Sequence, residues 1–119
     1  MDSSPQQRLD LAYASFREAF DRRKADLKAA GDDAQAEQVL ANIAVLESAY
    51  LTAAREALDG NGPAIESAYQ AAVDAKKKVD EAYAAAKSMA ERVALVGDLA
   101  AKVGDLVTEA SGKGGAASA

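Results

Sequence analysis

A repeat of apolar residues in the second half of the chain constrains the fold most strongly. From Ile65 to Ala110, alternating steps of three and four residues land on an apolar residue every time. A mean period of 3.5 residues is typical of a long helix that packs along one seam against other helices. A continuous helix over residues 63–110 would be about 72 Å long, at 1.5 Å per residue. We therefore expect this helix to organise the fold.

Two further helices are predicted before this segment. Residues 4–7, Ser-Pro-Gln-Gln, combine a capping serine, a proline at the first helical position and an S-x-x-Q capping box. The apolar stripe that follows ends at Gly31. A second seam begins after Asp32, which can cap it, and ends at the Gly-Asn-Gly of residues 60–62. Its apolar face is broad enough to need neighbours on two sides, as in a bundle.

The predicted fold class is all-α, an antiparallel up-down-up three-helix bundle or coiled coil with a long third helix. No segment has the alternation of a half-buried strand, and alanine is the commonest residue. Residues 1–4 are expected to form an N-terminal cap and residues 5–110 a single helical domain. Residues 111–119 lack periodicity and are expected to be a disordered tail. The helices are expected at about residues 5–30, 33–59 and 63–110.

The third helix is longer than the two helices that should cover it. Each of these is about 40 Å long, so they match the third helix only to about residue 92. The remainder is the most aliphatic part of the chain, and exposing its seven large side chains would forgo on the order of 10 kcal/mol.

Two arrangements would cover this segment. In the first, the helix is continuous and its end packs on another chain, most simply a second copy related by a two-fold axis. In the second, the chain breaks near Gly97 and Asp98 caps a short fourth helix that folds back. We favour the continuous helix, because the seam stays in phase through Gly97.

Small residues make this segment a candidate contact element. Ala90, Gly97, Gly104 and Ser111 lie seven residues apart, and such a line lets another helix approach closely. The predicted partner-binding residues are Val93, Val96, Gly97, Leu99, Val103, Gly104, Leu106 and Val107.

The composition excludes several kinds of chemistry. The chain has no cysteine, histidine or tryptophan, which removes disulfides, thiol catalysis, Cys or His zinc ligation and histidine acid–base catalysis. The apolar seam of the third helix offers no inward carboxylates for a metal. We therefore predict that the protein is not an enzyme and has no catalytic, cofactor-binding or metal-binding residues.

The charge distribution suggests an alternative function. The net charge of −5 argues against broad binding of nucleic acid. Residues 32–62 contain six acidic residues and one arginine, so they form the acidic part of the chain. A small acidic inhibitor or immunity-type protein would use these carboxylates to block a basic surface of an enzyme or nucleic-acid-binding protein. The residues concerned are Asp32, Asp33, Glu37, Glu47, Glu56 and Asp59.

Arg23 interrupts the apolar stripe of the first helix. Three explanations are open: its guanidinium extends into water, it pairs with Glu37 or another carboxylate, or a partner supplies the acid. The basic clusters at residues 22–24 and 76–78 are expected to be solvated, with pairing to the acidic middle helix as an addition.

The preferred function is a non-enzymatic helical protein–protein interaction module. It would self-associate or bind a partner through the apolar C-terminal part of the third helix. The expected partner is a second copy, with a dimer as the favoured oligomer, or another protein. No uncharged stretch approaches the roughly 18 residues of a membrane span. No basic region followed by an apolar run is present, so we expect a cytoplasmic protein. Export without a signal, or a trimmed leader, would give the same sequence.

Overall fold

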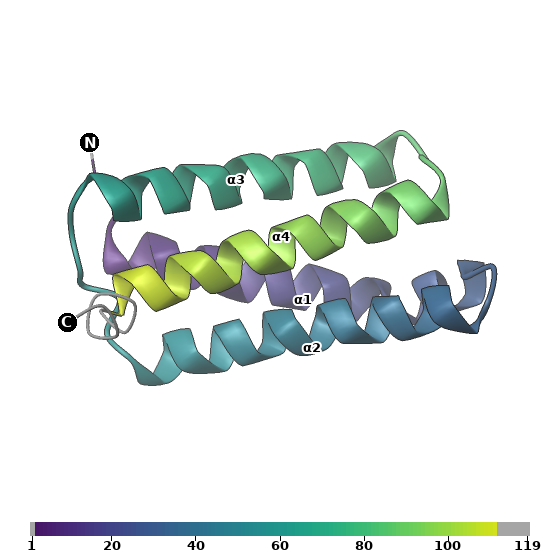
Figure 1. The fold of residues 1–119 in the computed structure, drawn as a ribbon, viewed down its shortest axis with the longest axis horizontal. Coiled ribbons are helices and arrows are strands. Elements are labelled where there is room, and N and C mark those ends of the chain that lie inside the picture. Colours follow the sequence, from purple (N-terminus) through teal and green to yellow (C-terminus); the bar gives the residue numbers. More distant parts are fainter. Residues whose placement is uncertain (1, 112–119) are drawn as a thin grey trace.

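The computed structural model describes residues 2–111, and within them the chain forms four helices and no strand (Figure 1). The prediction of an all-α fold is confirmed. The predicted tail lies outside the described residues, apart from Ser111. The helices are α1 (Pro5–Ala29), α2 (Asp33–Arg55), α3 (Pro63–Ala84) and α4 (Met89–Ala110).

The first three helices begin where their capping signals indicate. At α1 the Gln7 amide donates to Ser4 Oγ at 3.1 Å, and the Ser4 amide donates to Gln7 Oε1 at 2.8 Å. At α2 the Gln35 amide donates to Asp32 Oδ1 at 2.8 Å. Pro63 occupies the first turn of α3. These bonds satisfy amide groups that have no partner inside the helix.

The single long helix predicted for residues 63–110 is wrong. The chain leaves the helix after Ala84 and starts a new one at Met89, so α4 folds back along α3. A fourth helix is present, but Gly97 lies inside it and is not the point of the break. Folding back covers the apolar residues of α4 within the chain, which a continuous helix would have left exposed.

The break is a helix-ending turn with an alanine in the left-handed position. Ala86 has φ 53°, its amide donates to the carbonyl of Tyr83, and the Lys87 amide donates to that of Ala82 at 3.0 Å. This pair of bonds closes many helices, usually with glycine at the left-handed residue. Because alanine is apolar in either conformation, the 3.5-residue repeat continues through the turn and conceals it.

One sequence signal did mark the start of α4. Ser88 is followed three residues later by Glu91, the S-x-x-E pattern of a capping box. In the structure the Glu91 amide donates to Ser88 Oγ at 3.2 Å. This pattern would have placed the break correctly.

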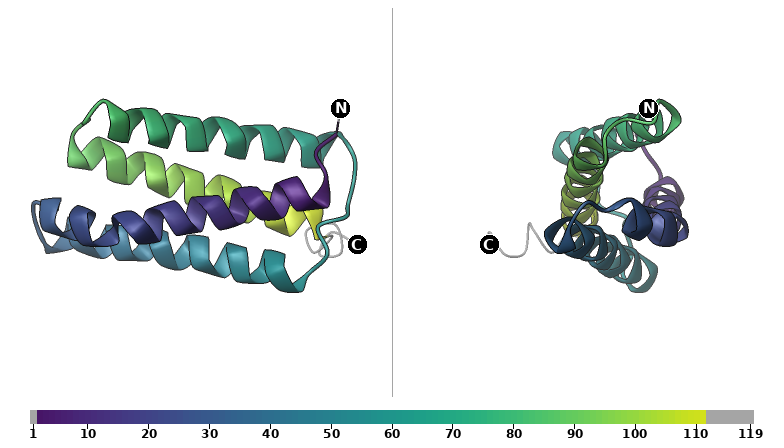
Figure 2. Two further views of the ribbon diagram at one scale, coloured as in Figure 1. Left: turned by 180° about the vertical axis from the view of Figure 1, so that it is seen from behind. Right: turned by 90° about the vertical axis from the view of Figure 1, so that its right-hand side faces the viewer.

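The helices form two antiparallel hairpins, α1/α2 and α3/α4, packed side by side in a molecule of 43 × 25 × 21 Å (Figures 1 and 2). α4 packs on each of the other three helices, whereas α1 and α3 have much less contact with each other. α2 and α3 follow one another in sequence but are not neighbours, so the expected pairing between them is wrong. Around the bundle the order is α1, α2, α4, α3.

The segment between α2 and α3 crosses the end of the bundle. α2 ends at Arg55, four residues earlier than expected, and the following residues run diagonally towards α3. Within this crossing segment, residues 56–62, the side chain of Leu58 is buried. The Gly60 amide donates to the carbonyl of Ala110 at 3.0 Å. The crossing segment therefore closes one end of the bundle and contacts the last turn of α4.

Replacing Ala86 with glycine should stabilise the protein. A non-glycine residue in the left-handed region costs about 1 kcal/mol, which glycine does not pay. We expect Ala86→Gly to raise the free energy of unfolding by roughly 0.5–1 kcal/mol, measured by urea denaturation. The control, Ala84→Gly at the end of α3, should lower it by a similar amount. An equal decrease in the free energy of unfolding in both variants would contradict the left-handed conformation of Ala86.

Candidate functional site

The apolar residues predicted to bind a partner lie in the interior of the bundle. Val103 and Leu106 are completely buried, and the other four aliphatic residues of the set are at most 8% exposed. The reason given for a partner, that nothing within the chain covers this segment, is wrong. α1, α2 and α3 cover it, so the burial of these residues needs no second chain. The four aliphatic residues of the set that are at most 8% exposed are Val93, Val96, Leu99 and Val107.

The two glycines of the predicted contact line have different surroundings. A Cβ on Gly97 would meet Asn42 Oδ1 of α2 at 3.4 Å, so the close neighbour at this point is the chain's own helix. A Cβ on Gly104 would meet nothing within 4 Å. The structure therefore brings Gly97, but not Gly104, against another helix.

The six carboxylates of the acidic alternative do not gather in one place. They extend along α2 and into the turns at both of its ends, a distance of more than about 30 Å. Asp32 caps α2, and Glu37 and Glu47 are exposed on the helix. Asp33 and Asp59 are also exposed, and Glu56 is half-buried. The inhibitor function stays an untested prediction.

Arg23 is exposed at the edge of the bundle. Its guanidinium carbon lies 4.4 Å from the ring centre of Phe20, and within residues 2–111 it forms no ion pair with Glu37. This placement agrees with the first of the three explanations, a basic group that extends into water. In the second basic cluster Lys77 and Lys78 are exposed, as expected, whereas Lys76 pairs with carboxylates of α1 and α3 rather than α2.

The principal exposed apolar surface lies along the outer side of the α1/α2 hairpin. Four aromatic rings contact one another there: Tyr13 lies 5.1 Å from Tyr50, and Phe16 lies 5.8 Å from both Tyr50 and Phe20, measured between ring centres. Ile43 of α2 is half-buried and packs against the core, and the exposed Leu40 and Leu51 extend the surface along α2. We call this set of seven residues the aromatic face.

The aromatic face is unusually open for so large a group of rings. Tyr13 is 44% exposed and Phe20 is 37% exposed, while Leu40 and Leu51 are each nearly half exposed. The bundle interior, in contrast, consists mainly of alanine, valine and leucine. Contiguous apolar surface of this kind is a feature of interaction sites.

The sequence contained part of the signal for this face. The broad apolar seam of α2 predicts neighbours on two sides, and α1 and α4 are those neighbours. Leu40 and Leu51 lie beyond both neighbours, and Phe20 and Tyr13 lie at the outer edge of the α1 stripe. A stripe pattern does not separate the edge of an apolar face from its interior, so it could not predict that these residues are exposed.

A buried arginine joins four parts of the chain at the end where the crossing segment lies. Arg8 is 2% exposed, and its Nη1 donates to the carbonyls of Leu58 and Gly60 at 2.6 and 2.7 Å. Its Nε donates to Ser3 Oγ, and its Nη2 donates to Glu66 Oε2 at 2.8 Å. A buried guanidinium is tolerated because these acceptors satisfy it. These bonds use four of the five N–H groups of the guanidinium, so we regard the network as structural.

Glu66 completes this network and has a shifted pKa. The Ser3 amide donates to Glu66 Oε1 at 2.8 Å, and Ser3 Oγ and Arg8 donate to Oε2. The hydrogen bond from the Ser3 backbone is the largest cause that lowers the pKa of Glu66, and the Arg8 side chain adds to it. Hydrogen bonds to the charged form of a carboxyl favour that form.

Ion pairs replace apolar packing between α1 and α3. Lys76 Nζ lies 2.8 Å from Glu18 and 3.0 Å from Asp80, and Arg22 also approaches Asp80. Burial opposes both charges, but the hydrogen bonds outweigh it, so the pKa of Lys76 is raised and that of Asp80 is lowered. The charges of this seam neutralise each other, which suits joining two helices rather than binding an ion.

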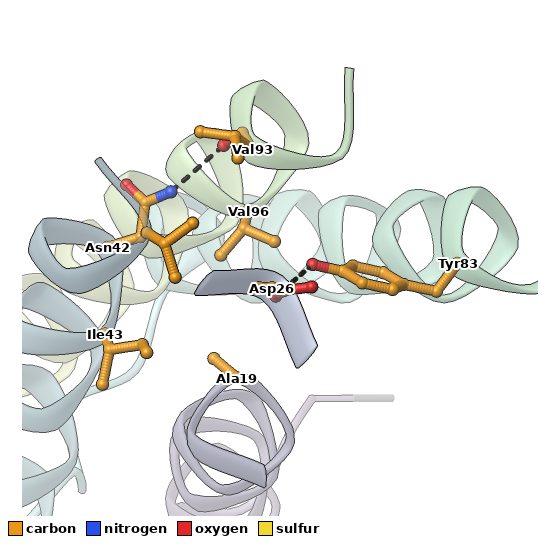
Figure 3. Close-up of a pocket in the computed structure, with 8 residues that line it drawn as sticks. Ala19, Asp26, Asn42, Ile43, Tyr83, Val93 and Val96 are labelled. Carbon is orange, nitrogen blue, oxygen red and sulfur yellow. Dashed lines mark hydrogen bonds between the residues drawn. The ribbon is translucent and has the colours of Figure 1, made fainter. Parts of the chain in front are cut away.

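A small cavity lies near the opposite end of the bundle (Figure 3). Its volume is about 10 Å³, enough for about one water molecule and too small for an organic ligand. The Tyr83 hydroxyl donates to Asp26 Oδ2 at 2.7 Å, and Asn42 Nδ2 donates to the carbonyl of Val93 at 3.1 Å. The remaining lining residues are Ala19, Val39, Ile43 and Val96.

The tyrosine of this cavity is held in its neutral form. Burial is the largest cause that raises the pKa of Tyr83, and the negative charge of Asp26 raises it further. The Arg22 guanidinium lies 4.0 Å from the centre of the ring, where its attraction to the ring helps to fix the side chain. A neutral phenol that donates to a carboxylate is a structural hydrogen bond, with no free acid or base beside an open site.

Neither a metal site nor a membrane span is found in the part of the chain that the structure describes. No three side chains of the types His, Cys, Asp and Glu come together there in a group that could hold a metal ion. In the same residues, every helix is too short or too polar to cross a bilayer.

Acid should destabilise the protein partly through Glu66. A carboxyl whose pKa is lower in the folded state contributes stability at high pH, and loses it as the pH falls from its usual value of 4.5 through the lower folded value. We expect Glu66→Gln to be less stable than the wild type at pH 7 and to lose less stability on acidification. Urea denaturation across that range measures both effects.

The matched control is Glu81→Gln, which removes an exposed carboxyl from the same helix. It should retain the full acid sensitivity of the wild type. A Glu66→Gln variant that loses as much stability as the wild type below pH 4.5 would show that this carboxylate does not contribute.

Comparisons with protein-family models, curated proteins and solved structures gave no match. The function is therefore inferred from the chain's own geometry.

Proposed function

We propose that the protein is a non-enzymatic interaction module that binds another protein chain through the aromatic face. The proposal retains the function expected from the sequence but moves the contact surface from α4 to the outer side of α1 and α2. The observation that carries it is the cluster of contacting rings of Tyr13, Phe16, Phe20 and Tyr50, of which Tyr13 and Phe20 are exposed.

Aromatic residues are the most effective anchors in protein interfaces. Phenylalanine and tyrosine bury large areas and lose few rotatable bonds on binding, and they are enriched in the centres of interfaces. Both phenylalanines and two of the four tyrosines lie on this one face. Solvent exposure of the Tyr13 and Phe20 rings opposes the hydrophobic effect, and a bound chain would remove that cost.

The shape of the face favours a helical partner. The face is formed by two antiparallel helices in contact, α1 and α2, and its apolar residues repeat along both helices at helical spacing. An amphipathic helix or helix pair laid along this face would pack its own side chains between theirs. Charged residues border the apolar strip on both sides, as in the rim of an interface.

Photo-cross-linking in the cells that produce the protein tests this proposal. A benzoylphenylalanine at position 20 keeps an aromatic ring in the middle of the face. We expect it to form a covalent adduct with a protein chain on irradiation, which immunoblotting detects as a shift in mass. The matched control carries the same group at Ala101, an exposed position on α4.

The size of the adduct identifies the partner as a second copy or as another protein. Absence of an adduct at position 20, or equal labelling from both positions, would contradict the proposed surface. The proposal includes the cytoplasmic location expected from the sequence, and fractionation of the same cells checks it.

A further inference from the structure

We infer that the occupant of the aromatic face is a second copy of this chain, related by a two-fold axis that runs parallel to the helices. In this dimer, α1 of each copy packs against α2 of the other, and the two hairpins form an antiparallel four-helix arrangement around the rings. The inference rests on the proposed function of the aromatic face and specifies its partner.

The positions of residues along the two helices follow from the ring contacts. Tyr13 of α1 lies beside Tyr50 of α2, 5.1 Å apart, so residues whose numbers sum to about 63 lie at the same level of the hairpin. Charged residues border the aromatic strip on the outer side of each helix. At each of four levels, the charge on α1 is opposite to the charge on α2. The four pairs are Asp10 and Arg55, Arg17 and Glu47, Lys24 and Glu37, and Lys28 and Asp33.

These opposite charges do not pair within the chain. Among residues 2–111 the structure contains no ion pair between any member of these four pairs and its counterpart. Within the same described residues, the only ion pair that any of the eight forms is the exposed i,i+4 pair of Arg17 with Asp21. At 100° per residue, the charges of each helix fall on the side of its rings that is away from the other helix, so the rings lie between the two rows of charges. The charges are therefore available to a molecule that covers the strip.

A two-fold axis parallel to the helices satisfies all four levels at once. It places α1 of one copy opposite α2 of the other at the same level, so that Arg17 faces Glu47 of the second copy and Lys24 faces Glu37 of the second copy. An axis perpendicular to the helices would instead place α1 against α1, where three of the four charges are positive. It would also place α2 against α2, where three of the four are negative. The charges therefore favour the parallel axis.

The long side of the molecule that carries the face is large enough for such a dimer. The molecule measures 43 × 25 × 21 Å, so either long side exceeds the about 800 Å² that each partner contributes to a stable interface. A two-fold interface must be complementary to itself, and the same strip supplies both the rings and the matching charges. A different protein would have to reproduce this pattern of charges, whereas a second copy carries it already.

Sedimentation of charge-reversed variants tests the inference. The wild type should sediment at micromolar concentration with twice the mass of the 12.3 kDa chain. The substitutions Glu47→Arg and Arg17→Glu should each raise the dissociation constant of the dimer roughly tenfold. Each replaces two attractive charge pairs per dimer with two repulsive ones. The double variant Arg17→Glu/Glu47→Arg restores opposite charges. Its dissociation constant should lie within a few-fold of the wild-type value.

The control is Glu81→Arg, which makes the same change of charge on α3 and should dimerise as the wild type does. All these positions are exposed, so the variants should fold. A dimer unaffected by the single substitutions, or a double variant as weak as the singles, would overturn the arrangement. A monomeric wild type would overturn self-association. The proposed function would then stand only if position 20 cross-links to a different protein.

Discussion

Burial of the apolar face of α4 is the interaction on which the rest of the structure depends. α4 lies against all three other helices, and its residues Val103 and Leu106 are completely buried. Occupation of the interior by α4 keeps α1 and α3 apart, so their seam is closed by ion pairs of long side chains. It also leaves the rings of α1 and α2 on the outside. The location of the aromatic face is therefore a consequence of how the chain folds back.

Local features of the fold could be predicted from the sequence because they depend on neighbouring residues. Ser4 and Asp32 cap helices as expected, since the groups they bind lie three residues away. The turn at residues 85–88 could not be predicted from apolar periodicity, because alanine satisfies that pattern both inside and outside a helix. The packing of helices that are far apart in the sequence was even harder to predict. The contact between α2 and α4 joins helices that are not consecutive, and no local pattern encodes it.

The candidate site illustrates the same limit. Val93, Val96 and Leu99 were assigned to a partner because their covering helices could not be identified from the sequence, and the structure places those helices within the chain. The exposure of Tyr13 and Phe20 could not be predicted, because an apolar stripe does not reveal which of its edges is covered. Burial is a property of the whole bundle. An interaction surface made of residues left over from the core becomes visible only when the neighbours of each helix are known.

Concentration-dependent hydroxyl-radical footprinting tests most directly whether the aromatic face is the contact surface between copies. Tyr13 and Phe20 should be oxidised readily in dilute protein and become protected as the concentration rises through the dimerisation range. Tyr83, whose hydroxyl is bonded to Asp26 on the other side of α1, serves as an internal reference and should not change. Oxidation of Tyr13 and Phe20 that is the same at all concentrations, or that falls in parallel with Tyr83, would contradict this assignment.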